Sequence, residues 1–82
     1  MTRQEVFEKT QSVLVDLFEL DPQSVVLTAH LMDDLDLDSI DAIDLAVATE
    51  REMGLDVSEE EMRSLQTVQD VVDLIHLRLG EK

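Results

Sequence analysis

Apolar residues recur three and four positions apart in four segments of this chain. Such spacing is typical of helices that bury one face against a core. In the first segment, about residues 3–19, Thr2 followed by Glu5 matches a capping box and predicts a helix start at Arg3. The apolar face of this segment consists of Val6, Phe7, Thr10, Val13, Leu14, Leu17 and Phe18.

The second predicted helix runs from Ser39 to Met53 and has signals at both ends. Asp38 is the expected N-cap, Asp41 completes a box-like first turn, and Gly54 is the expected C-terminal cap. One apolar stripe of this helix suits a buried face. It consists of Ala42, Leu45, Ala46, Thr49 and Met53.

Two further segments predict a short third helix and a longer fourth one. Ser58 precedes three glutamates, so we expect the third helix to begin there and to end near Leu65. Thr67 is the expected cap of the fourth helix, whose stripe ends before Gly80. The stripe consists of Val68, Val71, Val72, Ile75 and Leu79.

A long connection from Leu20 to Asp38 separates the first two helices. Asp21 followed by Pro22 predicts a single helical turn inside it, because proline suits the first helical position. The apolar residues expected to hold the connection on the core are Leu27, Leu31, Met32 and Leu35. The pattern predicts an all-α fold: a small four-helix bundle with a long first loop and a short third helix, formed by residues 1–82 as a single domain.

Acidic residues dominate the composition. Twenty Asp and Glu against six Lys and Arg give a formal net charge of -14 at pH 7. Such a surface repels nucleic acids and anionic lipids and attracts basic patches on partner proteins. The absence of cysteine excludes a disulfide framework, a zinc–thiolate site and a thiol nucleophile. Residues 1–5 lack an apolar signal segment and no run is long enough to span a membrane, so we expect a cytoplasmic protein that is a monomer alone.

One metal-binding interpretation fails on spacing. Asp34, Asp36 and Asp38 are spaced like the first three ligands of an EF-hand loop. However, Ser39 stands at the required glycine position and Leu45 at the position of the bidentate glutamate. We therefore predict no dedicated metal site and only weak cation binding by the acidic surface.

Catalysis by the chain itself is not expected. Its two histidines are His30, in the long connection, and His76, which is expected on the solvated surface of the fourth helix. A Ser–His–acid triad needs a buried and oriented constellation that a bundle of this size can hardly build. We predict no catalytic residues.

Ser39 is the residue whose position calls for more than a structural role. Because Asp38 already fills the cap, Ser39 occupies the first helical position and its hydroxyl faces outward. Free backbone N–H groups and the positive end of the helix dipole favour an anion there. A lone serine at a helix start is otherwise ordinary capping chemistry.

A second stripe on the same helix begins beside Ser39. Its apolar members are Ile40, Ile43 and Val47, and the acids interleaved with it are Asp41, Asp44 and Glu50. The stripe is either a second buried side of a central helix or a docking face that meets Lys and Arg on visiting proteins.

These residues resemble a known family. The run Asp-Leu-Asp-Leu-Asp-Ser-Ile-Asp at residues 34–41 is similar to the Asp-Leu-Gly-x-Asp-Ser-Leu-Asp segment of acyl carrier proteins. Residues 56–60 and 65–70 resemble that family's third helix and the cap of its fourth. The resemblance implies that Ser39 accepts 4'-phosphopantetheine from coenzyme A through a phosphopantetheinyl transferase, with Asp38 belonging to the attachment motif.

The resemblance also implies a function and partners. The chain would carry fatty-acyl or polyketide intermediates as thioesters on the arm and present them to a ketosynthase and other acyl-processing enzymes with basic docking patches. In the family the bundle interior can shelter a growing chain. The implied recognition residues are Ile40, Asp41, Asp44, Val47, Glu50 and Arg51.

Four departures from the family pattern favour a specialised carrier over a housekeeping one. Asp36 replaces the usual glycine, Ile40 replaces leucine, and Thr49 replaces a larger apolar residue. Arg51 stands where the family often has another acid, which should alter the set of enzymes that dock well. The run at residues 34–41 resembles carriers of type II fatty-acid-like or polyketide pathways of the aryl-polyene kind.

Two rival functions share parts of this pattern. An acidic helical adaptor that is never modified would explain the charge and the second stripe, but not a serine at the first position of the helix. A peptidyl carrier of nonribosomal synthesis shares the arm. Such carriers usually have a glycine-rich approach to the serine and are less acidic, so the acyl carrier is favoured.

Overall fold

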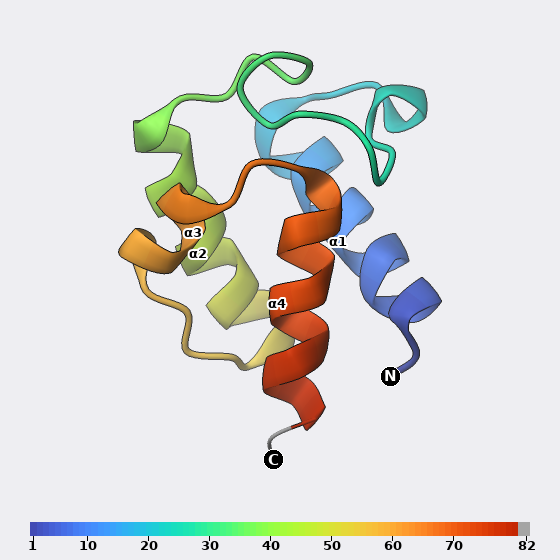
Figure 1. Cartoon of the computed structure of the whole chain (residues 1–82), viewed down its shortest axis with the longest axis vertical. Coiled ribbons are helices and arrows are strands. Elements are labelled where there is room, and N and C mark those ends of the chain that lie inside the picture. The colour runs from blue at the N-terminus through green and yellow to red at the C-terminus, as the bar shows by residue number, and fades with distance from the viewer. Residues whose placement is uncertain (81–82) are drawn as a thin grey trace.

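Four α-helices and one 3-10 turn follow one another in the computed structural model, which describes residues 1–80. Their bounds are α1 Arg3–Phe18, η1 Pro22–Ser24, α2 Ser39–Met53, α3 Glu59–Ser64 and α4 Val68–Gly80 (Figure 1). The predicted all-α bundle with a long first loop and a short third helix is confirmed. None of the helices in this described range is long and apolar enough to cross a membrane.

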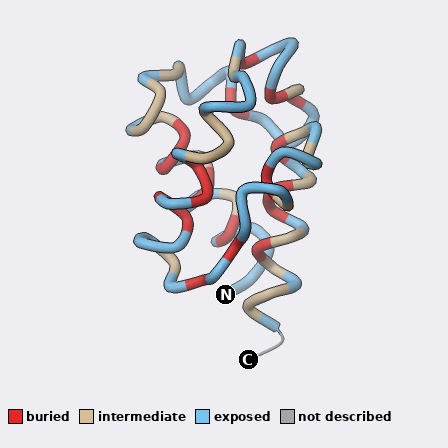
Figure 2. Tube along the Cα trace, turned by 90° about the vertical axis from the view of Figure 1, so that its left-hand side faces the viewer, coloured by how far each residue is buried: buried red, intermediate tan, exposed pale blue. Residues whose placement is uncertain are grey.

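The helices pack so that each buries one face. α1 packs against both α2 and α4, and α3 packs against α2. The first connection crosses one end of the bundle (Figure 1). Buried and exposed positions alternate along every helix in Figure 2, as expected for amphipathic helices around one core. The largest side chains fully removed from water are Val6, Thr10, Leu14, Val25, Thr49, Val68, Val71, Val72 and Ile75.

The helix ends follow the local signals of the sequence. The predicted capping boxes of Thr2 with Glu5 and of Asp38 with Asp41 are both present, and Ser58 forms a third with Glu61. α2 ends as predicted at Gly54, whose φ of 67° lies in the left-handed region that favours glycine. Such caps satisfy backbone groups that a helix leaves unpaired at its ends.

Two helix bounds differ slightly from those predicted. α1 ends one residue earlier, because Glu19 takes a left-handed conformation with φ of 56° and so stops the helix. α4 includes Gly80 rather than ending before it. Both differences fall at helix ends, where the pattern of apolar residues carries little information.

The long connection is held on the bundle by backbone hydrogen bonds and by apolar side chains. The N–H of Leu31 donates to the carbonyl of Gln66 at 2.8 Å, and the N–H of Val68 donates to that of Ala29 at 3.0 Å. These bonds form an isolated antiparallel bridge between the connection and the start of α4. The predicted single turn after Asp21 is also present.

Only part of the expected apolar contact of this connection forms. Leu31 and Leu35 are buried as predicted. Leu27 and Met32 are 39% and 58% exposed, so the prediction was wrong for them. Val25, which was not predicted, is completely buried and replaces them in the core. A connection without helical periodicity does not reveal from sequence which of its apolar residues turn inward.

Candidate functional site

Ser39 is the first residue of α2 and is exposed. The cap of this helix is Asp38, whose Oδ1 accepts hydrogen bonds from the backbone N–H of Ile40 at 3.0 Å and of Asp41 at 3.1 Å. Within residues 1–80 no hydrogen bond involves the hydroxyl of Ser39. The hydroxyl is therefore available for chemistry while the helix remains capped.

The backbone reaches Ser39 through a turn of the kind that usually contains glycine. Asp36 has φ of 58°, in the left-handed region that favours glycine. Aspartate tolerates this region better than most residues, because its short polar side chain can bond locally. The N–H of Leu37 then donates to the carbonyl of Leu31 at 3.0 Å and holds the turn on the connection. The motif thus keeps a glycine-type backbone without a glycine.

An apolar groove lies beside Ser39, and we call it the α2–α3 groove. Its volume is about 30 Å³, room for only one or two water molecules, so the groove is shallow. Its polar edge is formed by Asp38, Ser39, Asp41 and Arg63. Its apolar walls are Leu31, Met32, Leu37, Ala42, Leu45, Met62 and Leu65.

The α2–α3 groove suits a flexible chain attached at Ser39. Methylene groups of such a chain gain by covering the apolar walls. The polar edge supplies groups that can bond its amides. Among residues 1–80, Arg63 is the one basic residue that lines the groove, and its Nη2 donates to Glu59 Oε1 at 2.8 Å. The residues present therefore fit a long arm that begins with an anionic group on Ser39 Oγ.

The predicted recognition residues of α2 are mostly accessible. Ile40 and Val47 are 67% and 56% exposed, high fractions for large apolar side chains. Asp44, Glu50 and Arg51 are exposed as well. These five residues form one surface, which we call the α2 face. Exposed apolar side chains flanked by charges are typical of a protein-docking surface.

Two members of the predicted stripe lie differently. Asp41 is half-buried, and its Oδ2 accepts the backbone N–H of Asp38 at 3.0 Å, so its carboxylate serves the cap. Ile43 is half-buried and belongs fully neither to the core nor to the α2 face. The other stripe is mostly buried as predicted, and Thr49 is 2% exposed despite its hydroxyl.

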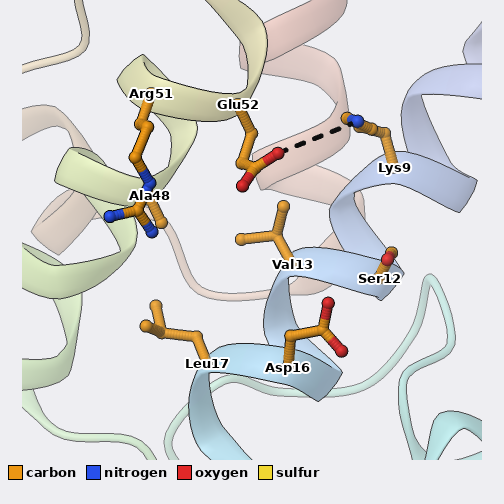
Figure 3. A pocket seen from close by; sticks show the side chains of 8 residues that line it. All are labelled: Lys9, Ser12, Val13, Asp16, Leu17, Ala48, Arg51 and Glu52. Carbon is orange, nitrogen blue, oxygen red and sulfur yellow. Dashed lines mark ion pairs between the residues drawn. The ribbon is translucent and has the colours of Figure 1, made fainter.

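A second groove, the α1–α2 groove, was not predicted from the sequence (Figure 3). It encloses about 160 Å³ between two helices that lie far apart in the sequence. Lys9 Nζ lies 3.9 Å from Glu52 Oε2 at its border. Its lining residues are Lys9, Ser12, Val13, Asp16, Leu17, Ala48, Arg51 and Glu52.

At the start of α4, backbone hydrogen bonds lower the pKa of the Asp70 carboxyl. The backbone N–H groups of Gln66 and Thr67 donate to Asp70 Oδ2 at 3.0 and 3.1 Å. These bonds stabilise the carboxylate and lower the pKa of Asp70, with the Gln66 bond the largest cause. Thr67 Oγ1 in turn accepts the N–H of Asp70 at 3.2 Å, which confirms Thr67 as the predicted cap.

Within residues 1–80, neither histidine makes a hydrogen bond or an ion pair with Ser39. His30 Nδ1 lies 3.7 Å from Asp33 Oδ2. His76 is half-buried rather than solvated, so that prediction was wrong: it stands four residues after the buried Val72 and shares its side of α4. Within the described residues, no group of three or more His, Asp or Glu side chains is arranged to hold a metal ion.

Comparison with known proteins gives a consistent result. Residues 8–75 match the family described as phosphopantetheine attachment site. The chain is 39% identical over 80 residues to the acyl carrier protein of Petrotoga mobilis, covering 98% of this chain and 94% of that protein. It is 40% identical to the acyl carrier protein of Thermosynechococcus vestitus and 41% identical to acyl carrier protein 2 of Ralstonia nicotianae, each covering 98% of this chain and 99% of the other.

Proposed function

This chain belongs to the acyl carrier protein family, and from that premise we propose that Ser39 is the residue to which its arm is attached. Acyl carrier proteins are non-catalytic and are modified by a phosphopantetheinyl transferase. The cofactor is covalently attached 4'-phosphopantetheine, whose terminal thiol holds acyl groups as thioesters. The single observation that carries the assignment to Ser39 is its free, exposed hydroxyl at the first position of a helix capped by Asp38.

The surroundings of Ser39 support an anionic attachment. The first turn of α2 points unpaired backbone N–H groups and the positive end of the helix dipole towards this end of the helix. A phosphodiester on Ser39 Oγ would gain from both. Asp38 competes for the same N–H groups, but it uses those of Ile40 and Asp41 and makes no hydrogen bond with the hydroxyl of the exposed Ser39. Within the attachment motif the role of Asp38 is thus to hold the helix start.

The α2–α3 groove would receive the proximal part of the arm. Its walls come from α2, α3 and the connection, so an arm lying there contacts three parts of the fold. Because the groove encloses only about 30 Å³, we propose that the arm rests on the surface and swings out to partners. Shelter of a long acyl chain beneath this groove would require the helices to separate, since about 30 Å³ has no room for it.

The α2 face would dock the enzymes that load, extend and unload the chain. We propose a phosphopantetheinyl transferase, a ketosynthase and other acyl-processing enzymes with basic docking patches as partners. The support is the exposure of Ile40 and Val47 beside Asp44 and Glu50, in a chain with a net charge of -14. Opposite charges accelerate encounter, and the apolar pair supplies contact area.

The pathway is proposed from the departures in the motif. Asp36 at the glycine position and Arg51 on the α2 face favour a specialised type II fatty-acid-like or polyketide pathway over housekeeping fatty-acid synthesis. We propose that the chain acts in the cytoplasm, where coenzyme A supplies its arm, and that it is a monomer when alone. Residues 1–82 are proposed to be one carrier domain, of which residues 81–82 lie outside the described part.

The test is an intact mass after incubation with coenzyme A and a broad phosphopantetheinyl transferase. The parent should gain the mass of one phosphopantetheine, and Ser39→Ala should gain none. Ser24→Ala is the matched control, since Ser24 is exposed in the η1 turn and should leave the gain unchanged. No gain on the parent with several transferases would favour the alternative, an unmodified acidic adaptor that binds a basic protein through the α2 face.

A further inference from the structure

Arg51 differs from the other Lys and Arg residues of the described chain in having no ion pair. Within residues 1–80, the remaining Lys and Arg side chains each contact a carboxylate. The pairs are Arg3 with Asp73, Lys9 with Glu52, Arg63 with Glu59 and Arg78 with Glu61. In a chain with 20 acids, an arginine without an intramolecular partner is available to an external carboxylate.

The position of Arg51 makes it part of the α2 face. Residues 40, 44, 47 and 51 are spaced by four, three and four positions, so they lie in one row along an α-helix. At about 1.5 Å per residue, Arg51 lies about 10 Å beyond Asp44 and about 18 Å from Ser39 along the axis. The row therefore carries a negative charge near Ser39 and a positive charge at its far end.

Arg51 also borders the α1–α2 groove. Figure 3 shows Arg51 and Glu52 of α2 across the groove from Val13 and Leu17 of α1. The apolar lining of the groove consists of Val13, Leu17 and Ala48. Asp16 lines the same groove but is within ion-pair distance of no Lys or Arg of the described chain. A hollow of about 160 Å³ is large enough for one side chain of a partner.

We propose that Arg51 and the α1–α2 groove form a second docking element, which binds an acidic side chain of the partner enzyme and an apolar side chain next to it. The inference deepens the proposed function and rests on it. The partner's docking surface then has two parts. It is basic where it meets Asp44, and it is acidic where it meets Arg51, about 10 Å further from Ser39 along the axis of α2.

The proposal explains how the chain would select among enzymes. An enzyme whose docking patch is basic throughout would place a cation against Arg51. The repulsion between these two positive charges would lower its affinity for this chain. An acid at that position forms a bidentate pair with the guanidinium instead. Arg51 also lies in the last turn of α2, where a cation stabilises the helix dipole, but that role affects folding and not the choice of partner.

The partner surface can be identified from position 52, which borders the same groove and leaves Arg51 in place. A photoreactive phenylalanine analogue is placed at position 52, and separately at position 47, in the full chain carrying its arm, and irradiated in the source cells. Mass spectrometry then maps the cross-linked residues. We expect both positions to cross-link the same acyl-processing enzyme, with an Asp or Glu beside the site reached from position 52 and Lys or Arg around the site reached from position 47.

The decisive step is a reciprocal charge swap with that purified enzyme. Arg51→Glu should weaken binding at least about tenfold, and replacing the partner's acid by Arg should restore most of that loss. Arg3→Glu is the matched control: it makes the same charge change on α1 and should change the affinity little. Thermal melts of each variant exclude unfolding as the cause.

Several results would overturn the proposal. Binding by Arg51→Glu equal to that of the parent, or a lack of rescue by the swap, rules out the acid–Arg51 pair. A cross-link from position 47 alone excludes the α1–α2 groove from the interface, and a cross-link from position 52 to a second copy of this chain makes the groove a self-association site. The mass of the parent, measured first, shows separately whether attachment at Ser39 has failed.

Discussion

The backbone N–H of Asp38 donates to Asp41 Oδ2 at 3.0 Å, and the backbone N–H of Asp41 donates to Asp38 Oδ1 at 3.1 Å. This reciprocal pair closes the first turn of α2 without using the side chain of Ser39. Ser39 can therefore be modified without loss of the cap. Asp38 and Asp41 therefore hold the helix start at which Ser39 lies.

Removing the Asp38 cap should destabilise the fold. Asp38→Ala loses the side-chain acceptor for two backbone N–H groups, and we expect a loss of about 1 kcal/mol, or about 4–8 °C in melting temperature for a domain of this size. Asp38→Asn keeps an acceptor and should lose much less. Urea and thermal unfolding followed by circular dichroism measure both. Equal stability of Asp38→Ala and the parent would show that the cap contributes nothing.

The turn at Asp36 should become more stable with glycine. A non-glycine residue in the left-handed region costs on the order of 1 kcal/mol, and glycine would remove this cost. Glycine also raises the conformational entropy of the unfolded chain, which cancels part of the gain in stability. We expect Asp36→Gly to stabilise the fold by about 0.5–1 kcal/mol. Asp36→Ala removes the same charge but keeps a Cβ, so it should be the less stable variant. If alanine and glycine stabilise equally, charge removal and not backbone strain is the cause.

The stability that Asp70 contributes should disappear in acid. Its pKa is lowered in the folded state by the N–H bonds from Gln66 and Thr67, so the contribution is complete above the unfolded pKa of about 3.9 and is lost as the pH falls through the lower folded value. We expect Asp70→Asn to be about 1 kcal/mol less stable than the parent at pH 7, with the gap closing below about pH 4.

The control for this titration is Asp56→Asn, since Asp56 is exposed and its carboxylate makes no hydrogen bond or ion pair within the described chain. Unfolding in urea at a series of pH values gives both differences. A gap between parent and Asp70→Asn that stays constant down to pH 3 would mean that the bonds to Asp70 do not depend on its charge. The Asp56 variant should show no gap that depends on pH.

Salt should stabilise the fold by screening its acids. The molecule is 32 Å along its longest axis, and the Debye length falls from about 30 Å at 0.01 M salt to about 8 Å at 0.15 M. At the lower concentration most of the 14 excess negative charges repel one another across the whole bundle. We expect the melting temperature to rise over this range, and a variant carrying Asp33→Asn and Glu60→Gln to respond less.

Magnesium at the same ionic strength separates screening from binding. A larger rise with magnesium than with sodium would indicate weak cation binding by the acidic surface, as the sequence predicts. An equal rise would indicate screening alone. A melting temperature that does not change with either salt would contradict the idea that charge repulsion limits stability.

Most helix bounds could be predicted because their signals are local. The cap of α2 depends on Asp38 and Asp41, three residues apart, and its end depends on Gly54. Hydrogen bonds of this kind link residues within about one turn, so the order of residue types is enough to place them. The motif from which Ser39 is proposed as the attachment residue lies in the same stretch. The position of Ser39 at the helix start could be predicted because Asp38 is the cap.

The exposure of residues in the first connection could not be predicted in the same way. Leu31 is buried and Met32 exposed, although both are apolar and adjacent. Which of them turns inward depends on the bond from Leu31 N–H to Gln66, a residue 35 positions away. The half-burial of His76 likewise depends on how α4 packs against its neighbours.

The sequence by itself determined four helices, their caps, the exposed position of Ser39 at a helix start and the acidic charge, because each depends on neighbours along the chain or on composition. Only the tertiary structure decided that Arg63 lies in the groove beside Ser39, and that Arg51 borders a groove with Leu17 of α1. Grooves form between elements that are distant in the sequence, and their depth depends on how closely the helices pack. That packing decides which surfaces remain for partners.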